Sequence, residues 1–165
     1  MLPLPHKLEK IISGGQTGAD FGGLLGAKDA GIPTGGWAPK GYRTQNGPMP
    51  ELARFGLLET ASADYPDRTE RNVRDADGTV VYDVSPKFSA GSDLTVRLCH
   101  QHKKPCLVIK MFSDKDVSDL VDFIDSHNIK VLNVAGNRET NAPGIQEKVR
   151  KIVAQAIAEL SKRYL

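Results

Sequence analysis

Six short apolar runs alternate with amphipathic helical patterns along this chain of 165 residues. Three of the runs, residues 80–82, 106–109 and 131–134, are almost continuously apolar. Such runs are typical of strands buried on both faces, as in a parallel sheet. The sequence therefore predicts an α/β fold of the Rossmann-like, doubly wound type, with a mostly parallel sheet and helices on both faces. The expected strands are residues 8–13, 32–36, 57–60, 79–84, 105–110 and 130–135.

Apolar residues at helical spacing predict helices over residues 17–30, 114–127 and 143–160, with a shorter one after Ser92. Residues 66–77 are expected to form a polar helix with charge pairs at i, i+4 spacing. No repeat or linker divides the chain, so residues 1–165 are expected to form a single domain. The stretch 38–50, which is rich in Pro and Gly, is interpreted as a long functional loop.

The helix predicted over residues 17–30 has two unusual features. Thr17 is expected to be its N-cap, with Asp20 completing a variant of the capping box. Gly22, Gly23 and Gly26 lie inside it, and each costs about 1 kcal/mol relative to Ala. We therefore expect a close backbone approach along this helix.

A glycine-rich turn, residues 13–20, joins the first strand to this helix. Backbone N–H groups in such a turn can face an anion, and the positive end of the helix adds to the attraction. One interpretation is a phosphate-binding loop, and the other is a tight turn without a ligand. The first interpretation makes candidate ligand-binding residues of Gly14, Gly15, Gln16, Thr17 and Gly18.

Two further loops of small and polar residues follow predicted strands, and carboxyl ends of parallel strands meet at one edge of a sheet. The first loop, residues 85–92, ends in a segment that resembles a second anion-binding nest. The second loop, residues 136–140, follows the last strand. We expect the phosphate to lie between residues 14–17 and 89–92, with Lys40 or Arg138 adding charge. The candidates in these loops are Ser89, Gly91, Ser92, Gly136, Arg138 and Glu139.

Two other segments leave alternatives open. After the second strand, Gly36, Trp37 and Lys40 could serve a flat acidic ligand through ring stacking and charge, or Trp37 could be a core residue beside a solvated Lys40. The helix over 66–77 has few apolar residues, so either it is an exposed helix with many ion pairs or Arg68, Thr69 and Asn72 face a site or a subunit interface.

Composition and motifs exclude several classes of function. The net charge is only +2 and no dense basic stripe is present, which argues against nucleic-acid binding. No apolar run approaches the ~20 residues of a membrane span, and two reduced cysteines fit a cytoplasmic protein. The patterns of dinucleotide-binding, P-loop and serine-hydrolase proteins are absent. The histidines do not cluster, so we expect no metal bound by the protein's own side chains.

Together these segments resemble a known family. The segments that carry the resemblance are residues 12–20, 31–41, 68–79, 132–139 and 142–144. In this order they are similar to the molybdenum cofactor carrier proteins, a circularly permuted branch of the Rossmann-like superfamily that includes the LOG-type phosphoribohydrolases. The resemblance implies a non-catalytic protein that binds, protects and transfers molybdenum cofactor, a phosphate-bearing pterin. It also implies a homo-oligomer, with a tetramer favoured, and a molybdoenzyme or a cofactor-biosynthesis protein as partner.

Two alternative functions remain open at this point. The chain could hydrolyse nucleoside monophosphates, as the related hydrolases do, or sense a nucleotide-derived signal. Hydrolysis would need a carboxylate against the sugar. The candidates in the suspected loops are Asp20, Asp93 and Glu139. Arg97 follows the second glycine-containing segment, where the related hydrolases have a glutamate, and an arginine cannot act as a general acid.

Overall fold

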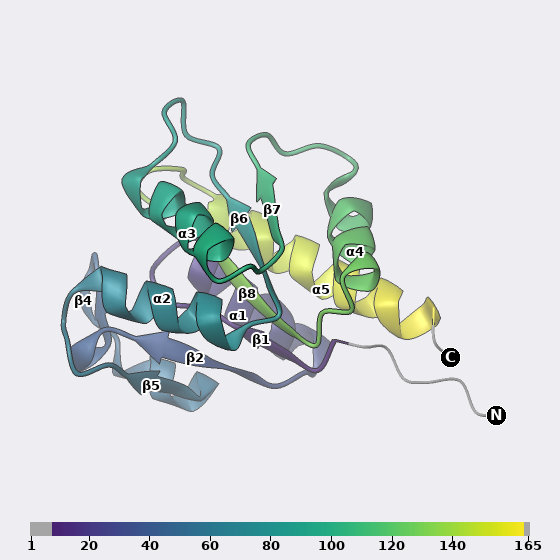
Figure 1. Cartoon of the computed structure of the whole chain (residues 1–165). Coiled ribbons are helices and arrows are strands. Elements are labelled where there is room, and N and C mark those ends of the chain that lie inside the picture. Colours follow the sequence, from purple (N-terminus) through teal and green to yellow (C-terminus); the bar gives the residue numbers. More distant parts are fainter. Residues whose placement is uncertain (1–7, 164–165) are drawn as a thin grey trace.

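A parallel sheet of six strands forms the centre of the structure, which is a computed structural model describing residues 8–163 (Figure 1). Its strand order is β5-β2-β1-β8-β6-β7, and every neighbouring pair is parallel. All six predicted strands are confirmed, with ends that shift by a few residues. The strands are β1 (Lys10–Ile12), β2 (Thr34–Ala38), β5 (Leu57–Glu59), β6 (Gly78–Tyr82), β7 (Cys106–Ile109) and β8 (Val131–Gly136).

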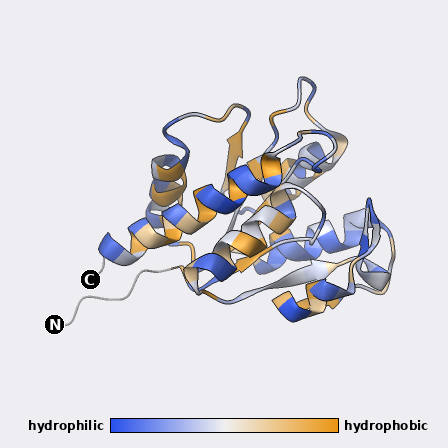
Figure 2. Ribbon diagram, turned by 180° about the vertical axis from the view of Figure 1, so that it is seen from behind, coloured by the Kyte–Doolittle hydropathy of each residue, from blue (hydrophilic) through white to orange (hydrophobic). Residues whose placement is uncertain are grey.

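Helices cover both faces of the sheet, which confirms the predicted α/β class. On one face α1 (Ala19–Ala30) and α4 (Asp116–Ser126) pack against α5 (Ile145–Arg163). On the other face α2 (Tyr65–Asp75) packs against α3 (Ala90–Gln101). Figure 2 shows apolar and polar segments alternating along α5, as expected for a helix with one face on the core.

The glycines of α1 allow the close backbone approach that the sequence predicts. A Cβ atom at Gly22 would lie 2.5 Å from the carbonyl oxygen of Gln146, and one at Gly26 would lie 2.5 Å from that of Arg150. Both carbonyls belong to α5. The backbones of α1 and α5 are therefore too close for any side chain between them, and this contact compensates for the low helix propensity of glycine.

Residues 39–56 differ from the expected loop. They form two 3₁₀ segments, η1 (Lys40–Tyr42) and η2 (Pro50–Phe55), and a small hairpin of β3 (Arg43–Thr44) and β4 (Gly47–Pro48). Leu52 of η2 packs with Leu24 and Leu57 in a second small core. The segment is therefore an ordered extension of the sheet edge.

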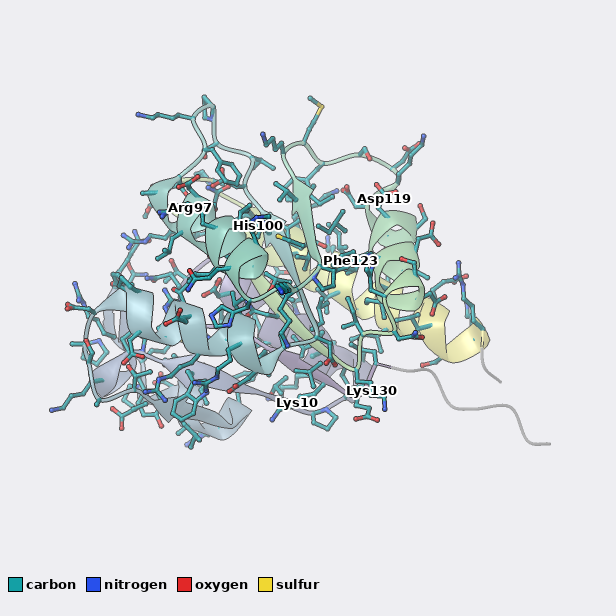
Figure 3. The ribbon with its side chains drawn as sticks, viewed as in Figure 1. Lys10, Arg97, His100, Asp119, Phe123 and Lys130 are labelled. Carbon is teal, nitrogen blue, oxygen red and sulfur yellow. The ribbon has the colours of Figure 1, made fainter. Side chains whose placement is uncertain are left out.

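The chain changes faces between two neighbouring strands. From β6 it continues into α3 on one face, whereas from the adjacent β8 it continues into α5 on the other. In open α/β sheets, ligands bind in the crevice at such a switch point, beyond the carboxyl ends of the strands. Lys10 and Lys130, at the amino ends of β1 and β8, mark the opposite edge (Figure 3). None of the helices formed by residues 8–163 is long and apolar enough to cross a membrane.

Candidate functional site

A cavity of about 470 Å³ lies at the carboxyl ends of β1 and β8, between α2 and α3. Its volume is within the range of small-molecule sites. The loops that follow β1, β6 and β8 all contribute to it, as expected from the sequence. The sequence-predicted site residues that line it are Gly14, Gln16, Asp20, Arg68, Thr69, Asn72, Ser89, Gly91, Ser92, Gly136 and Arg138. Those that do not line it are Gly15, Thr17, Gly18, Gly36, Trp37, Lys40 and Glu139.

The deep end of the cavity contains a buried ion pair. Asp20 Oδ2 accepts a hydrogen bond from Arg68 Nη1 at 3.0 Å and one from the Gln16 amide at 3.2 Å. The Arg68 and Asp20 side chains are only 11% and 6% exposed. Burial raises the pKa of Asp20, and the Arg68 guanidinium offsets this only in part. The predicted capping box is therefore wrong: the N-cap of α1 is Gly18, which makes no side-chain cap, and Asp20 serves the cavity instead.

Two buried hydrogen-bond donors at this ion pair, one of them on Arg68 itself, have no partner among the described residues. They are Gln16 Nε2 and Arg68 Nε, and both atoms are buried. Gln16 Oε1, in contrast, accepts from the amides of Thr17 and Gln45. Unpaired buried donors are costly unless an acceptor is supplied. The deep end of the cavity therefore favours a ligand that carries hydrogen-bond acceptors.

Close packing holds Arg68 in place. A Cβ atom at Gly14 would lie 1.6 Å from Arg68 Nη1, so only glycine leaves room for this guanidinium. The ring of Tyr65 lies near three guanidinium groups, those of Arg43 at 4.6 Å, Arg138 at 5.1 Å and Arg68 at 5.3 Å. Tyr65, Arg68 and Arg138 line the cavity, whereas Arg43 does not. The ion pairs formed by residues 8–163 include none with Arg138, so its charge is available to an anion.

The amino end of α3 forms the opposite wall. Asp83, which follows β6, accepts hydrogen bonds from the hydroxyl groups of Ser85 and Ser89 and from their amides. Burial alone would raise the pKa of Asp83, but bonds from Ser85, Ser92 and Ser89 outweigh it and hold the pKa well below its ordinary value. Ser89 in turn is the N-cap of α3 and accepts from the Ser92 amide at 3.2 Å.

The helix α3 begins at Ala90, three residues earlier than the start after Ser92 that the sequence predicts. Residues 89–92 are therefore a capped first turn of a helix. Ala90 and Gly91 line the cavity, and the first N–H groups of a helix have no acceptor within it. This end of α3 can therefore add to the attraction for an anion.

Glu139 and Asn137 organise the loop after β8. The Glu139 carboxylate accepts from the amides of Gly144 at 2.6 Å and Gln146 at 3.0 Å, so it caps the start of α5. The buried Asn137 side chain accepts from the Val84 amide at 2.7 Å and ties this loop to the one after β6. Both residues therefore fix the shape of the site from outside the cavity.

The candidate residues Gly36, Trp37 and Lys40 lie outside the cavity. The strand β2 extends to Ala38, so Gly36 and Trp37 lie within it. Asn72 accepts from the Trp37 amide and donates to its carbonyl, and the indole N–H donates to Asp75 at 2.9 Å. Trp37 is thus a half-buried residue that holds α2 against β2, and Lys40 has an exposed side chain.

Three residues of the glycine-rich turn shape the chain itself. Gly15 has φ of 74°, and a Cβ atom there would meet Leu52 at 2.7 Å. Gly18 has φ of 84°, and a Cβ atom there would lie 2.3 Å from the Asn137 carbonyl oxygen. The Thr17 hydroxyl donates to Gln45 at 3.2 Å. These positions therefore support Gly14 and Gln16, which face the cavity.

Sequence reasoning missed three lining residues that bring useful chemistry: Tyr65, Asn133 and Asn141. Asn133 could have been found, because it is a polar residue in the middle of an apolar strand run. Tyr65 stands directly before Pro66, which marks the first turn of α2. No comparable signal marks Asn141.

The residues that line the cavity supply many hydrogen-bond donors and few acidic groups. Within residues 8–163, Asp20 is the single acidic residue that lines the cavity. Of the other two candidate acids, Glu139 caps the start of α5 outside the cavity. Asp93 is 58% exposed and pairs with Arg97 of α3, which is labelled in Figure 3. Among the described residues, no group of three or more His, Cys, Asp and Glu side chains could hold a metal ion. The arrangement is suited to binding a small anion with additional acceptor atoms.

Two comparisons show which known proteins this chain is similar to. A sequence profile of cpYpsA, the circularly permutated YpsA SLOG family, matches residues 11–157, which include every residue that lines the cavity. The chain is also similar to the crystal structure of a "Putative molybdenum carrier protein" from Syntrophus aciditrophicus SB. The sequence identity is 40% and the TM-score is 0.82, and the match covers 93% of this chain and 96% of that one. No curated protein matches the sequence.

Proposed function

We propose, since this chain belongs to the circularly permutated YpsA SLOG family, that its cavity binds molybdenum cofactor and that the protein carries this cofactor without converting it. The similar crystal structure bears the name of a molybdenum carrier protein. The cargo would be a pterin whose side chain ends in a phosphate and whose dithiolene holds the metal.

The observation that supports this proposal most strongly is the excess of unpaired donors in the cavity. Arg138 forms no ion pair among residues 8–163 and acts on Asp20 only at longer range, and Gln16 Nε2 and Arg68 Nε are buried without acceptors. The charge of the one lining carboxylate, Asp20, is already opposed by Arg68. A dianionic phosphate beside Arg138 and the start of α3 would satisfy this imbalance.

The rest of the cargo fits the remaining walls. A pterin ring has several donors and acceptors along its edge, and the amide side chains of Gln16, Asn133 and Asn141 line the cavity. The metal would arrive with its own sulfur ligands. A cavity without a cluster of metal-ligating side chains is therefore compatible with this cargo.

Several further features belong to the same proposal. The 165 residues act as one domain, in the cytoplasm, as a homo-oligomer for which a tetramer is favoured. The loaded protein passes its cargo to a molybdoenzyme or to a protein of cofactor biosynthesis. The free thiols of Cys99 and Cys106 support a reducing compartment.

The test is to purify the protein from a host that makes the cofactor and to measure the fluorescent pterin released by acid and iodine. We expect a stoichiometric amount from the native chain and at least tenfold less from Arg138→Ala, which corresponds to about 1.4 kcal/mol. Arg43→Ala is the matched control. Arg43 also stacks on Tyr65, but it donates to the Ala63 carbonyl outside the cavity. Equal pterin from both variants, or none from the native chain, would refute the proposal.

A second candidate function is hydrolysis of nucleoside monophosphates. It is favoured by Asp20, because this carboxyl group lines the cavity and burial raises its pKa, which is the direction that a general acid needs. Incubation with nucleoside monophosphates tests it. Release of free base that is lost in Asp20→Asn would establish an enzyme, whereas binding without release would support a carrier or a nucleotide sensor.

A further inference from the structure

A second groove adjoins the cavity at Asn141, which lines both. Its volume is about 370 Å³. The walls are mainly apolar, with Pro86 from the loop after β6, Phe112 from the loop after β7, and Pro143. In the described part of the chain, the one charged residue that lines the groove is Lys148 of α5. The groove therefore combines a surface for a flat apolar group with one positive charge.

Two hydrogen-bonded loops separate the groove from the cavity. The Asn137 side chain accepts from the Val84 amide at 2.7 Å and donates to the Ser85 hydroxyl at 3.3 Å. Val84 and Ser85 line the groove, whereas Arg138 lines the cavity. A ligand that reaches both spaces must therefore pass over the rim at Asn141, whose amide donates to the Arg138 carbonyl at 3.0 Å.

Phe112 offers a stacking surface in the groove. One face of its ring stacks on the buried ring of Tyr82, with centroids 6.0 Å apart and planes at 24°. Lys148 Nζ lies 5.6 Å from the ring centroid. The Tyr82 contact fixes the plane of the ring, while a lysine side chain is flexible and can move aside. A planar heterocycle can then stack on Phe112.

From this arrangement we infer that the groove binds the base of a nucleoside that is joined through a pyrophosphate to the ligand in the cavity. The inference rests on the proposed function, because it starts from a phosphate beside Arg138. Arg138 lines the cavity and Lys148 lines the groove, so each space supplies one cation to a linker that carries negative charge. The chain would accordingly accept a nucleotide-extended form of its cargo.

Calorimetric titration of the full chain tests the inference, with inorganic pyrophosphate, ADP, GDP and CDP as probes. We expect at least one nucleoside diphosphate to bind ten times more tightly than pyrophosphate. Phe112→Leu keeps the apolar volume and removes the ring, so it should reduce this ratio below three while the pyrophosphate affinity stays unchanged. Urea unfolding of the variant establishes that it is folded.

Phe88→Leu is the matched control. Phe88 also lies beneath a lysine, with Lys110 Nζ at 5.3 Å, but it lines neither space. Equal affinities for pyrophosphate and the nucleotides, or a ratio that Phe112→Leu leaves unchanged, would overturn the inference and leave the proposed function intact. Pyrophosphate binding that is absent, or that Arg138→Ala does not weaken, would overturn the phosphate site and the inference with it.

Discussion

Replacing Gly14 with alanine probes how the cavity is held open. The new Cβ atom would lie 1.6 Å from Nη1, 2.7 Å from Cζ and 2.9 Å from Cδ of Arg68, and these are its three nearest neighbours. The backbone of Gly14 lies outside the positive-φ region, so alanine causes no strain of its own. The whole effect should therefore pass through the Arg68 side chain.

The magnitude follows from the ion pair that the collision breaks. The Arg68 guanidinium must leave its contact with Asp20, which is 3.0 Å long and largely buried. Removing one partner of a buried pair costs roughly 3–5 kcal/mol. Here the cation is displaced toward the cavity rather than deleted, and Asp20 can take up a proton, so we expect a loss of about 2 kcal/mol. With an m-value of about 2 kcal/mol/M, the urea midpoint would fall by roughly 1 M.

A double-mutant cycle identifies the cause. In an Arg68→Ala background the three neighbouring atoms are gone, and Gly14→Ala should cost less than about 0.5 kcal/mol. Gly91→Ala is a control for adding a methyl group at the cavity wall, because nothing lies within 4 Å of its Cβ position. It should be neutral, or stabilising by up to about 1 kcal/mol as a helical glycine-to-alanine change. An equal cost of Gly14→Ala in both backgrounds would refute the reasoning.

Two other predictions concern the carboxylates that shape the loops. Asp83→Asn should lower the free energy of unfolding by about 2 kcal/mol at pH 7, because the charged acceptor of the serine bonds is lost. The pKa of Asp83 is lowered by folding, so its contribution is present above the ordinary pKa and is lost as pH falls through the folded one. Urea titrations from pH 7 to pH 2 should therefore show the native chain and the variant converging in acid, and a constant difference would contradict this. Glu139→Ala should cost about 1–2 kcal/mol in thermal or urea unfolding, because two amides at the start of α5 lose their acceptor. Glu147→Ala, an exposed acid in the first turn of the same helix, should change stability by less than about 0.5 kcal/mol, and equal losses would remove the capping role.

The sheet could be predicted from the sequence because its strands carry their own signal. The run Val80, Val81 and Tyr82 is fully buried, and the periodicity of the helices matches their contact faces. Residues 39–56 lack such a signal. The strands β3 and β4 are two residues each, and η2 is held by Leu52 in a core shared with Leu24 and Leu57. A pattern of period 2 or 3.6 needs more residues than these segments contain.

The glycine-rich turn shows where such prediction ends. A missing Cβ can make room for a ligand or for the chain itself, and the sequence is the same in both cases. At Gly14 it makes room for Arg68, at Gly15 for Leu52, and at Gly18 for the backbone of residue 137. These neighbours come from distant segments. The turn could therefore be recognised, but the face that it presents to the cavity could not.

The polar helix α2 was ambiguous for the same reason. Its Asp67–Arg71 ion pair, at 2.8 Å, is what an exposed helix would form, yet Arg68, Thr69 and Asn72 line the cavity. The helix therefore has one face with exposed ion pairs and another face that lines the cavity. Spacing along one helix cannot reveal that Tyr65 gathers Arg43 from the hairpin and Arg138 from the loop after β8.

Asp20 would have a different role in a carrier than in a hydrolase. As a general acid it would need its proton and a free path to the leaving group. Burial raises its pKa and so favours the proton, but Oδ2 is engaged by Arg68 and by the Gln16 amide. An anion that takes Arg68 away from Asp20 would leave the carboxylate opposed only by the weaker effect of Arg138, and protonation would relieve it. The same residue therefore suits a carrier that exchanges one anion for another at Arg68, and hydrolysis would require a substrate that reaches Asp20 while this pair stays intact.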